Sequence, residues 1–355
     1  MRFSSTVCSA TLVGLYVSVI SVVGAPGLSL AVSGSNNFAG VQDFKVTTSL
    51  ANTGDEPLKL MKDPRTVLSS FPTDRFTISN AEGASPTFTG ARVKFVPEYV
   101  VKNNIEDAFV VLEPGASFEL EHDLSTCYNF TTPGKGTYDI RANNLFSYVD
   151  LNTNKITEIQ ATQEAPLTAS FTGTLSNARR HAKRVTYQSC SSGQQSQIAA
   201  AASAAASYAS SAASYLSSHT SSTTRYVSWF GTHDSGRHAT VLNHFNAING
   251  YPFTGSVTYV CGLCLTKPTA YAYVYPDQYG VIYLCNAFWT APNTGTDSRA
   301  GTLIHESSHF ITVAGTQDIV YGQSNARNLA NTNPANAIMN ADNHEYFAEN
   351  NPVEA

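Results

Sequence analysis

Lysine is scarce in this sequence, and the scarcity is confined to one half. Residues 1–184 contain eight lysines, whereas the 171 residues from 185 onward contain only Lys267. That second half has five Lys and Arg residues against nine Asp and Glu residues. With a net charge of -5 over the whole chain, there is no basic excess to attract phosphates. We therefore expect no nucleic-acid partner.

Long apolar runs are almost absent, and the clear one lies at the N-terminus. It extends from about Val7 to Val23, follows the basic start Met1-Arg2-Phe3, and ends at the small residues Gly24 and Ala25. This layout is typical of a secretory signal peptide, and the run is short for a membrane span. We expect residues 1–25 to be a signal peptide and the protein to be secreted, with no membrane partner; a retained anchor helix is the alternative.

Cysteine is sparse in the first half, where Cys8 lies in the apolar N-terminal run and Cys127 stands alone. The second half holds an even set of four, namely Cys190, Cys261, Cys264 and Cys285. In an oxidising compartment such a set indicates two disulfides, and the sequence leaves three pairings open. A cysteine-based zinc site is the alternative, but it would need a second closely spaced pair.

Two regions of different character meet near residue 184. Residues 26 to about 175 contain short alternating runs between turn residues, which predicts an all-β sandwich; the runs are 28–32, 44–50, 92–96, 109–112 and 138–142. The basic pairs within residues 179–184 are typical of a processing site in the secretory pathway, with a solvated charge cluster as the alternative. Asn129-Phe130-Thr131 is a glycosylation sequon. We find no catalytic set of residues here, and we expect His122 to be exposed.

Beyond residue 184 the pattern is mainly helical. The Ala/Ser tract 192–218 predicts a long helix, although a low-complexity linker is the alternative. Val241, Leu242, Phe245 and Ile248 have helical spacing, and 270–275 with 281–285 predict a β-hairpin. A further helix should contain His305, with an N-cap among residues 296–298 and its C-terminal end at Gly315. The expected fold is α+β, mainly helical with a small sheet.

The segment His305-Glu306-Ser307-Ser308-His309 has the H-E-x-x-H spacing of a zinc site. Two histidines four apart lie on one side of a helix, so both can bind one zinc ion, and Glu306 can reach a water molecule on the metal. Spacing alone leaves the third ligand open. Asp318 beyond the helix, Glu345 or Glu349 farther on, and a purely structural Asp318 are all compatible with it, while Gly315 stands where some related sites have a histidine.

Together with Gly315-Thr316-Gln317-Asp318-Ile319-Val320-Tyr321-Gly322, this motif resembles the aspzincin pattern of the deuterolysin family of fungal metallopeptidases. The resemblance is closer to the peptidyl-Lys metalloendopeptidases of mushrooms and covers nearly all of residues 186–355. It implies a zincin-like catalytic domain with one zinc ion, Asp318 as third ligand, Glu306 as general base and Tyr321 as oxyanion donor. It also implies synthesis with a propeptide, and the disulfide pairs Cys190–Cys261 and Cys264–Cys285.

Asp342 and Glu345 lie three residues apart and would share a helix face. Two carboxylates on one face can hold a buried lysine ammonium; acids that only complement a helix dipole are the alternative. The resemblance implies that they bind the lysine on the C-terminal side of the cleaved bond. The scarcity of lysine after residue 184 favours this interpretation, because it would protect a lysine-directed protease from itself.

The sequence as a whole predicts a secreted zinc metalloendopeptidase that cleaves before lysine. We expect a signal peptide at 1–25, a β-sandwich propeptide at 26–184 and a catalytic domain at 185–355. The expected partners are lysine-containing proteins and peptides and the protein's own propeptide, and we expect a monomer. A deuterolysin-like enzyme of broader specificity is the alternative, and a secreted binding protein with a degenerate zinc site is a third hypothesis.

Overall fold

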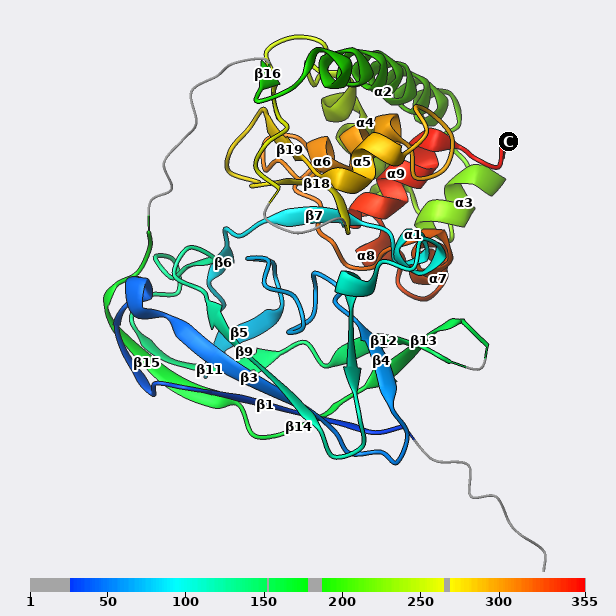
Figure 1. Cartoon of the computed structure of the whole chain (residues 1–355). Coiled ribbons are helices and arrows are strands. Elements are labelled where there is room, and N and C mark those ends of the chain that lie inside the picture. Colours follow the sequence, from blue (N-terminus) through cyan, green and yellow to red (C-terminus); the bar gives the residue numbers. More distant parts are fainter. Residues whose placement is uncertain (1–25, 152, 178–186, 265–268, 355) are drawn as a thin grey trace, which may run out of the picture.

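The computed structural model describes residues 26–151, 153–177, 187–264 and 269–354 (Figure 1). The predicted signal peptide and the basic segment 179–184 lie outside these residues. Within the described part of the chain, no helix combines the length and apolarity needed to cross a membrane. We call residues 26–177 the N-terminal region and residues 187–354 the C-terminal region.

The N-terminal region consists mainly of short strands, which form three four-stranded sheets and one two-stranded sheet. The five predicted runs coincide with β1, β3, β7, β8 and β11. The strand bounds are β1 Leu28–Gly34, β2 Asn37–Gly40, β3 Lys45–Asn52, β4 Leu58–Met61, β5 Phe76–Asn80, β6 Thr87–Phe88, β7 Arg92–Phe95, β8 Phe109–Leu112, β9 Ser117–Asp123, β10 Tyr128–Asn129, β11 Gly136–Ala142, β12 Leu145–Val149, β13 Ile156–Gln160, β14 Thr162–Gln163 and β15 Leu167–Thr174. The short α-helix α1 spans Pro97–Lys102, and two 3-10 helices span Val41–Asp43 and Glu106–Ala108.

Aromatic side chains fill the core between these sheets. Phe44, Phe130 and Phe171 pack against one another with ring centroids 4.2 to 6.0 Å apart. The expectation that His122 is exposed is wrong. Its side chain points into the core, where its ring nitrogens lie 2.9 Å from the Thr48 hydroxyl and 3.3 Å from Arg75 Nη1. Because these groups supply polar partners, a histidine can be buried on the inner face of β9.

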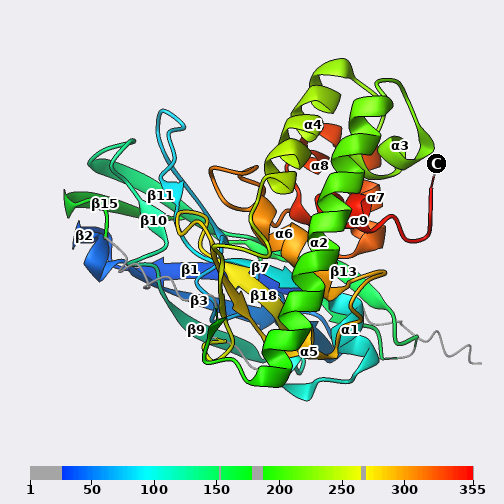
Figure 2. The same ribbon diagram turned by 90° about the horizontal axis from the view of Figure 1, so that it is seen from above.

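In the C-terminal region, α2 lies on the outer side and crosses over other helices (Figure 2). Ser191 and Gln194 form a capping box at its start, and small alanines on its inner face allow close packing against α4 and α6. The helix bounds are α2 Ser192–Ser218, α3 Thr224–Phe230, α4 Ser235–Asn249, α5 Asn286–Thr290, α6 Arg299–Ser308, α7 Gln323–Thr332, α8 Pro334–Ala337 and α9 Ala341–Glu349. The predicted long helix and the helix at 241–248 are therefore present.

The helix that carries His305 begins as predicted but ends early. Ser298 is its N-cap and accepts a hydrogen bond from the Gly301 amide. The predicted end at Gly315 is wrong, because α6 ends at Ser308 and the chain then turns through residues 310–315. The turn is closed by the Thr316 amide, which donates to the Ser308 carbonyl at 3.1 Å. His309 keeps helical dihedral angles, so its four-residue offset from His305 is preserved.

One five-stranded sheet joins the two regions, in the order β16-β17-β19-β18-β7. The C-terminal region supplies β16 Tyr187–Gln188, β17 Thr258–Val260, β18 Ala270–Val274 and β19 Val281–Leu284. β18 and β19 form the predicted hairpin. The fifth strand, β7, comes from the N-terminal region and lies along the boundary in Figure 1. It pairs antiparallel with β18, so one edge of the C-terminal sheet is covered by the N-terminal region.

Two disulfides lie beside the strands of this sheet. Cys190 pairs with Cys261, and Cys264 pairs with Cys285. These are the pairs that the family resemblance implied. Cys127 is buried in the N-terminal region. Asn129 of the sequon lies half-buried at the end of β10, and its side-chain oxygen accepts a hydrogen bond from the Thr131 amide at 2.9 Å.

Candidate metal centre

The two histidines of the H-E-x-x-H motif project from the last turn of α6 into the interior. Both are fully buried, and their ring centroids are 4.8 Å apart. Residues 300–308 are all buried as well, since α6 packs against α2, α9 and β7. A helix in such a position holds its side chains rigidly, which is what a preorganised site requires.

Asp318 approaches the histidines from the loop that follows the turn. The loop is fixed to the segment before α9, because the Asn340 side-chain oxygen accepts hydrogen bonds from the amides of Ile319 and Val320 at 2.9 and 3.2 Å. The Gln317 amide also donates to the Met339 carbonyl at 2.7 Å. Asp318 Oδ1 consequently lies 3.2 Å from His305 Nε2 and 3.2 Å from His309 Nε2.

These three atoms have the properties expected of zinc ligands. All three are buried and without a hydrogen-bond partner, and they belong to a His-His-Asp group whose ligand atoms lie within 4.8 Å of one another. His309 Nδ1 is 2.9 Å from the Thr316 carbonyl, so it carries the proton and Nε2 keeps its lone pair for a metal. Nitrogen and carboxylate donors in this number suit zinc and leave room for a water molecule.

The two other acids considered as third ligands lie elsewhere. Glu345 Oε2 is 3.3 Å from Nδ1 of His305, the ring nitrogen on the side away from Asp318. Glu349 accepts hydrogen bonds from the Ser298 amide and hydroxyl at 2.9 and 2.7 Å, so it supports the N-terminus of α6. His305, Asp342 and Glu345 also form a close group, but a lysine ammonium already lies between its two carboxylates.

Glu306 and Tyr321 face the same short stretch of β7. Glu306 Oε1 accepts a hydrogen bond from the Lys94 amide at 3.0 Å. The Tyr321 hydroxyl donates to the Val93 carbonyl at 2.8 Å, and the Val93 amide donates to Asp318 Oδ2 at 2.8 Å. A buried carboxylate, a hydroxyl donor and the candidate metal ligands are thus assembled around one segment of backbone.

The side chain of Lys94 enters a pocket of three carboxylates. Its ammonium is 2.7 Å from Glu345, 3.2 Å from Asp342 and 3.3 Å from Asp297. It also lies 4.9 Å from the centre of the Tyr346 ring, a cation–π distance. The side chains of Lys94, Asp342 and Glu345 have no exposed surface. We call Asp342, Glu345 and Asp297 the lysine pocket.

Burial and charge shift the pKa values of these groups in opposite directions. Burial raises the pKa of Glu306 well above its usual value, which suits a general base. Burial would also raise that of Asp318, but His309 and His305 outweigh this effect and hold its pKa well below its usual value. Burial lowers the pKa of Lys94, yet the three carboxylates dominate and raise it well above the ordinary lysine value.

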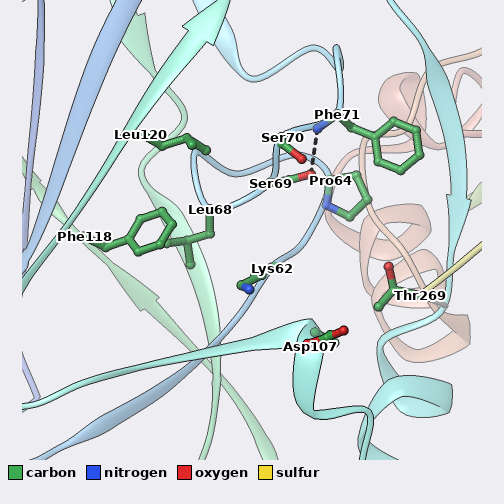
Figure 3. Close-up of a pocket in the computed structure, with 11 residues that line it drawn as sticks. Lys62, Pro64, Leu68, Ser69, Ser70, Phe71, Asp107, Phe118, Leu120 and Thr269 are labelled. Carbon is green, nitrogen blue, oxygen red and sulfur yellow. Dashed lines mark hydrogen bonds between the residues drawn. The ribbon is translucent and has the colours of Figure 1, made fainter. Parts of the chain in front are cut away.

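Two cavities lie along the boundary between the regions. One, of about 460 Å³, is lined mainly by the N-terminal region, including Lys62, Phe71 and Phe118 (Figure 3). The other, of about 370 Å³, includes Arg65, Arg92 and Asp318 in its walls. The second cavity therefore reaches the candidate metal centre, whereas the first does not include any of its ligands.

The structure brings the predicted metal-binding, catalytic and substrate-binding residues close together and adds three residues that the sequence analysis missed. Asp297 had been considered only as an N-cap, and Asn340 had no role. Lys94 was counted only as part of a strand. A signal for Lys94 was present, because a single lysine stands among Val93, Phe95 and Val96 in a run that is otherwise apolar.

The chain is similar to several known proteins. The family model described as "Lysine-specific metallo-endopeptidase" matches residues 215–349. The chain is 49% identical to the "Peptidyl-Lys metalloendopeptidase" of Grifola frondosa, over 98% of this chain and 99% of that one. It is 50% identical to the protein of the same name from Armillaria mellea, over 97% of each chain. A solved zinc peptidase from Grifola frondosa is 55% identical over 47% of this chain and all of its own, with a TM-score of 0.45.

Proposed function

The chain belongs to the aspzincin family of lysine-specific metallo-endopeptidases, and from this premise we propose that it hydrolyses the peptide bond on the N-terminal side of lysine. As a member of this family it is a zinc-dependent peptide hydrolase. The observation that supports the lysine preference most directly is the position of Lys94, whose ammonium lies among three carboxylates and whose backbone amide donates to Glu306.

We propose His305, His309 and Asp318 as the zinc ligands, because their donor atoms converge and lack other partners. When bound there, zinc supplies a Lewis acid that polarises a carbonyl group and makes a water molecule more acidic. Asp342 Oδ1 lies 2.9 Å from His305 Nδ1. It therefore orients the ring of one ligand while its carboxylate also faces the lysine pocket.

Glu306 and Tyr321 carry the proposed acid–base and oxyanion roles. Glu306 takes the proton of the attacking water and later gives it to the leaving amine. Its carboxylate is already within hydrogen-bonding distance of a backbone amide, that of Lys94. Tyr321 donates a hydrogen bond to the carbonyl oxygen as negative charge develops on it. The corresponding contact is made here with the Val93 carbonyl.

The lysine pocket provides the specificity. A lysine side chain that enters it loses its hydration shell and needs opposite charges in return. Glu345 and Asp342, fully buried on one face of α9, provide two such charges, and Asp297 provides a third that is 23% exposed. An uncharged side chain would leave these carboxylates without a cation, so the pocket favours lysine over apolar residues.

Substitutions in the pocket test this proposal. In the processed enzyme, Asp342→Asn should lower the preference for lysine peptides about 100-fold or more, and should reduce zinc content far less. Asp297→Asn should have a smaller effect on preference and none on zinc, since Asp297 contacts Lys94, Tyr346 and Glu349 rather than a proposed zinc ligand. Asp277→Asn, at an exposed position, is the matched control. Rates on peptides that differ only at the lysine, with metal analysis, measure both quantities.

Equal losses of lysine preference and of zinc in Asp342→Asn would contradict the assignment. A proteome digest by the wild-type enzyme distinguishes a lysine-specific enzyme from one of broader specificity. If the enzyme is lysine-specific, the cuts should fall before lysine. Zinc-loaded protein that hydrolyses no peptide would instead favour a binding protein.

For the whole chain we propose a secreted preproprotein. It would have a signal peptide at 1–25, a propeptide at 26–184 and a catalytic domain at 185–355, with Asn129 glycosylated and the mature enzyme monomeric. The two disulfides support passage through an oxidising compartment. N-terminal sequencing and intact mass of the secreted protein test the boundaries and the glycan together.

A further inference from the structure

β7 extends the C-terminal sheet in the way that a bound peptide extends a sheet edge. It runs antiparallel to β18, with Val93 opposite Tyr273 and Lys94 opposite Ala272. Addition of an extended segment to an open edge is a recurring mode of peptide recognition. The N-terminal region therefore occupies the edge on which an extended substrate could lie.

The carbonyl and the amide of the peptide bond between Val93 and Lys94 each contact one proposed catalytic group. Its carbonyl oxygen accepts the hydrogen bond of Tyr321, and its amide N–H donates to Glu306. The preceding amide, that of Val93, donates to Asp318. The group proposed to stabilise the oxyanion and the group proposed to protonate the leaving amine thus contact the two ends of a single peptide bond.

The side chain that follows this bond is the one that the enzyme is proposed to recognise. Lys94 lies on the C-terminal side of the bond, and its ammonium is held by all three acids of the lysine pocket. Val93 and Lys94 are fully buried. Main chain and side chain therefore both adopt the arrangement expected of a bound substrate of the Xaa-Lys type.

We propose that β7 is a substrate-mimetic inhibitor within the chain, in which Val93–Lys94 takes the position of the bond to be cleaved and Lys94 fills the lysine pocket. This inference rests on the proposed function. It gives the N-terminal region a definite inhibitory residue, and it means that a substrate lysine can enter only after Lys94 has left.

Contacts on both sides of the bond keep the strand in place. On one side Arg92 pairs with Asp74 at 3.1 Å within the N-terminal region. On the other, Phe95 packs edge-on against Tyr321 with ring centroids 5.7 Å apart. Farther away, Arg65 Nη1 donates to the Ile319 carbonyl at 2.7 Å. Because the strand is tethered at both ends, its local concentration at the cleft far exceeds that of a free peptide.

The inhibitory role of Lys94 can be tested in the full-length chain. Lys94→Met keeps most of the side-chain length but removes the cation, which leaves three carboxylates without it. We expect the unprocessed variant to hydrolyse a quenched peptide containing one lysine about tenfold or more faster than unprocessed wild type. Lys102→Met, eight residues away at an exposed position on α1, should leave the rate unchanged. Intact mass before and after the assay shows which chains remained uncut.

Removal of the N-terminal region from the same chains distinguishes the proposed function from the inhibitor proposal. All three should then cleave the peptide at one common rate, because they share an identical C-terminal region. A processed wild type without activity contradicts the proposed function. Active processed chains, combined with equal rates of the unprocessed Lys94→Met and wild-type chains, overturn the inhibitor proposal alone. A self-cut at Val93–Lys94 that Glu306→Gln abolishes would support the substrate-like pose.

A chemical measurement covers the case in which Lys94→Met does not fold. The unprocessed Glu306→Gln chain, which should not cut itself, is treated with an amine-acylating reagent under native conditions. Peptide mass spectrometry should find Lys102 modified and Lys94 protected until the chain is unfolded. Acylation of Lys94 at the rate of Lys102 would show that the ammonium is not held in the pocket, and would overturn the proposal.

Discussion

Each region of the molecule buries a cationic side chain, and the two cations are stabilised differently. In the N-terminal region, Arg75 donates to the Ser69 carbonyl and lies beside the neutral ring of His122. Burial lowers the pKa of Arg75 to about 10. Lys94, also from the N-terminal region, is instead surrounded by three carboxylates of the C-terminal region, and its pKa is raised.

This difference indicates that Arg75 is part of the core of its own region, whereas Lys94 is bound by the other region. The contacts of Arg75 Nη1 are with Ser69 and His122 of its own region, so this cation belongs to the core in which it lies. The carboxylates around Lys94 belong to the C-terminal region, which also carries the candidate metal centre, and two of them, Asp342 and Glu345, lie 2.9 and 3.3 Å from His305 Nδ1. Mutually repelling acids that are buried beside a metal site are costly unless a cation joins them. Their presence supports the proposal that this pocket binds the lysine of a substrate.

The first prediction tests whether all the chemistry belongs to the C-terminal region. In the processed enzyme, Glu306→Gln should reduce kcat on a lysine peptide by about 10²–10⁴-fold, because the general base is lost. Zinc content should not change, since Glu306 is not a proposed ligand. Glu354→Gln, at the end of the same region, should behave as wild type. A kcat within a few-fold of wild type would assign the base to another residue.

The second prediction concerns stability, because the two disulfides described here both lie in the C-terminal region. Replacing Cys190 and Cys261 by serine opens a separation of 71 residues and should lower the free energy of unfolding by about 4 kcal/mol. Replacing Cys264 and Cys285 opens 21 residues and should cost about 3 kcal/mol. Calorimetry of the full-length chain should show both losses in the transition of the C-terminal region. A loss of stability confined to the transition of the N-terminal region would contradict this prediction.

The third and smallest effect should appear in the N-terminal region at acidic pH. Burial and the nearby Arg75 lower the pKa of His122 to about 3. Since the unfolded chain takes up this proton near pH 6.5 and the folded chain does not, stability is complete above pH 6.5 and falls as the pH decreases. Between pH 6.5 and 4.5 the loss should be about 2 kcal/mol.

Thermal melts of the full-length chain across this pH range measure the effect. His122→Gln, which cannot be protonated, should flatten the pH dependence of the N-terminal transition and leave that of the other transition as it was. An unchanged slope in the variant would mean that His122 is not the responsible group.

Local signals in the sequence predicted much of the fold. Ala-rich composition and helical spacing identified α2 and α4, and alternation identified β1, β3 and β11. These patterns reflect the secondary-structure preference of each segment and which of its residues are buried. The end of α6 was missed because it depends on the return of Thr316 to Ser308, a contact that helix-stop rules based on glycine do not contain.

The candidate site was predictable where one motif contained its residues and not where distant segments meet. His305, Glu306 and His309 follow from spacing, whereas Asp318 was chosen over Glu345 only through the family resemblance. Lys94 contacts Glu306 and Asp342 across 212 and 248 residues. No periodicity over a single segment reports such a pairing. The apolar neighbours of Lys94 indicated burial, but they could not identify the carboxylates that make burial possible.

The shared sheet has one more consequence, for the behaviour of the enzyme in solution after β7 has left. β18, with the sequence Ala-Tyr-Ala-Tyr-Val and every residue buried here, would then become an edge strand with unpaired backbone groups. Flat apolar edges of this kind pair readily with other chains and promote aggregation. By pairing with β18, β7 therefore also covers this edge, and it protects the protein from self-association for as long as it stays in place.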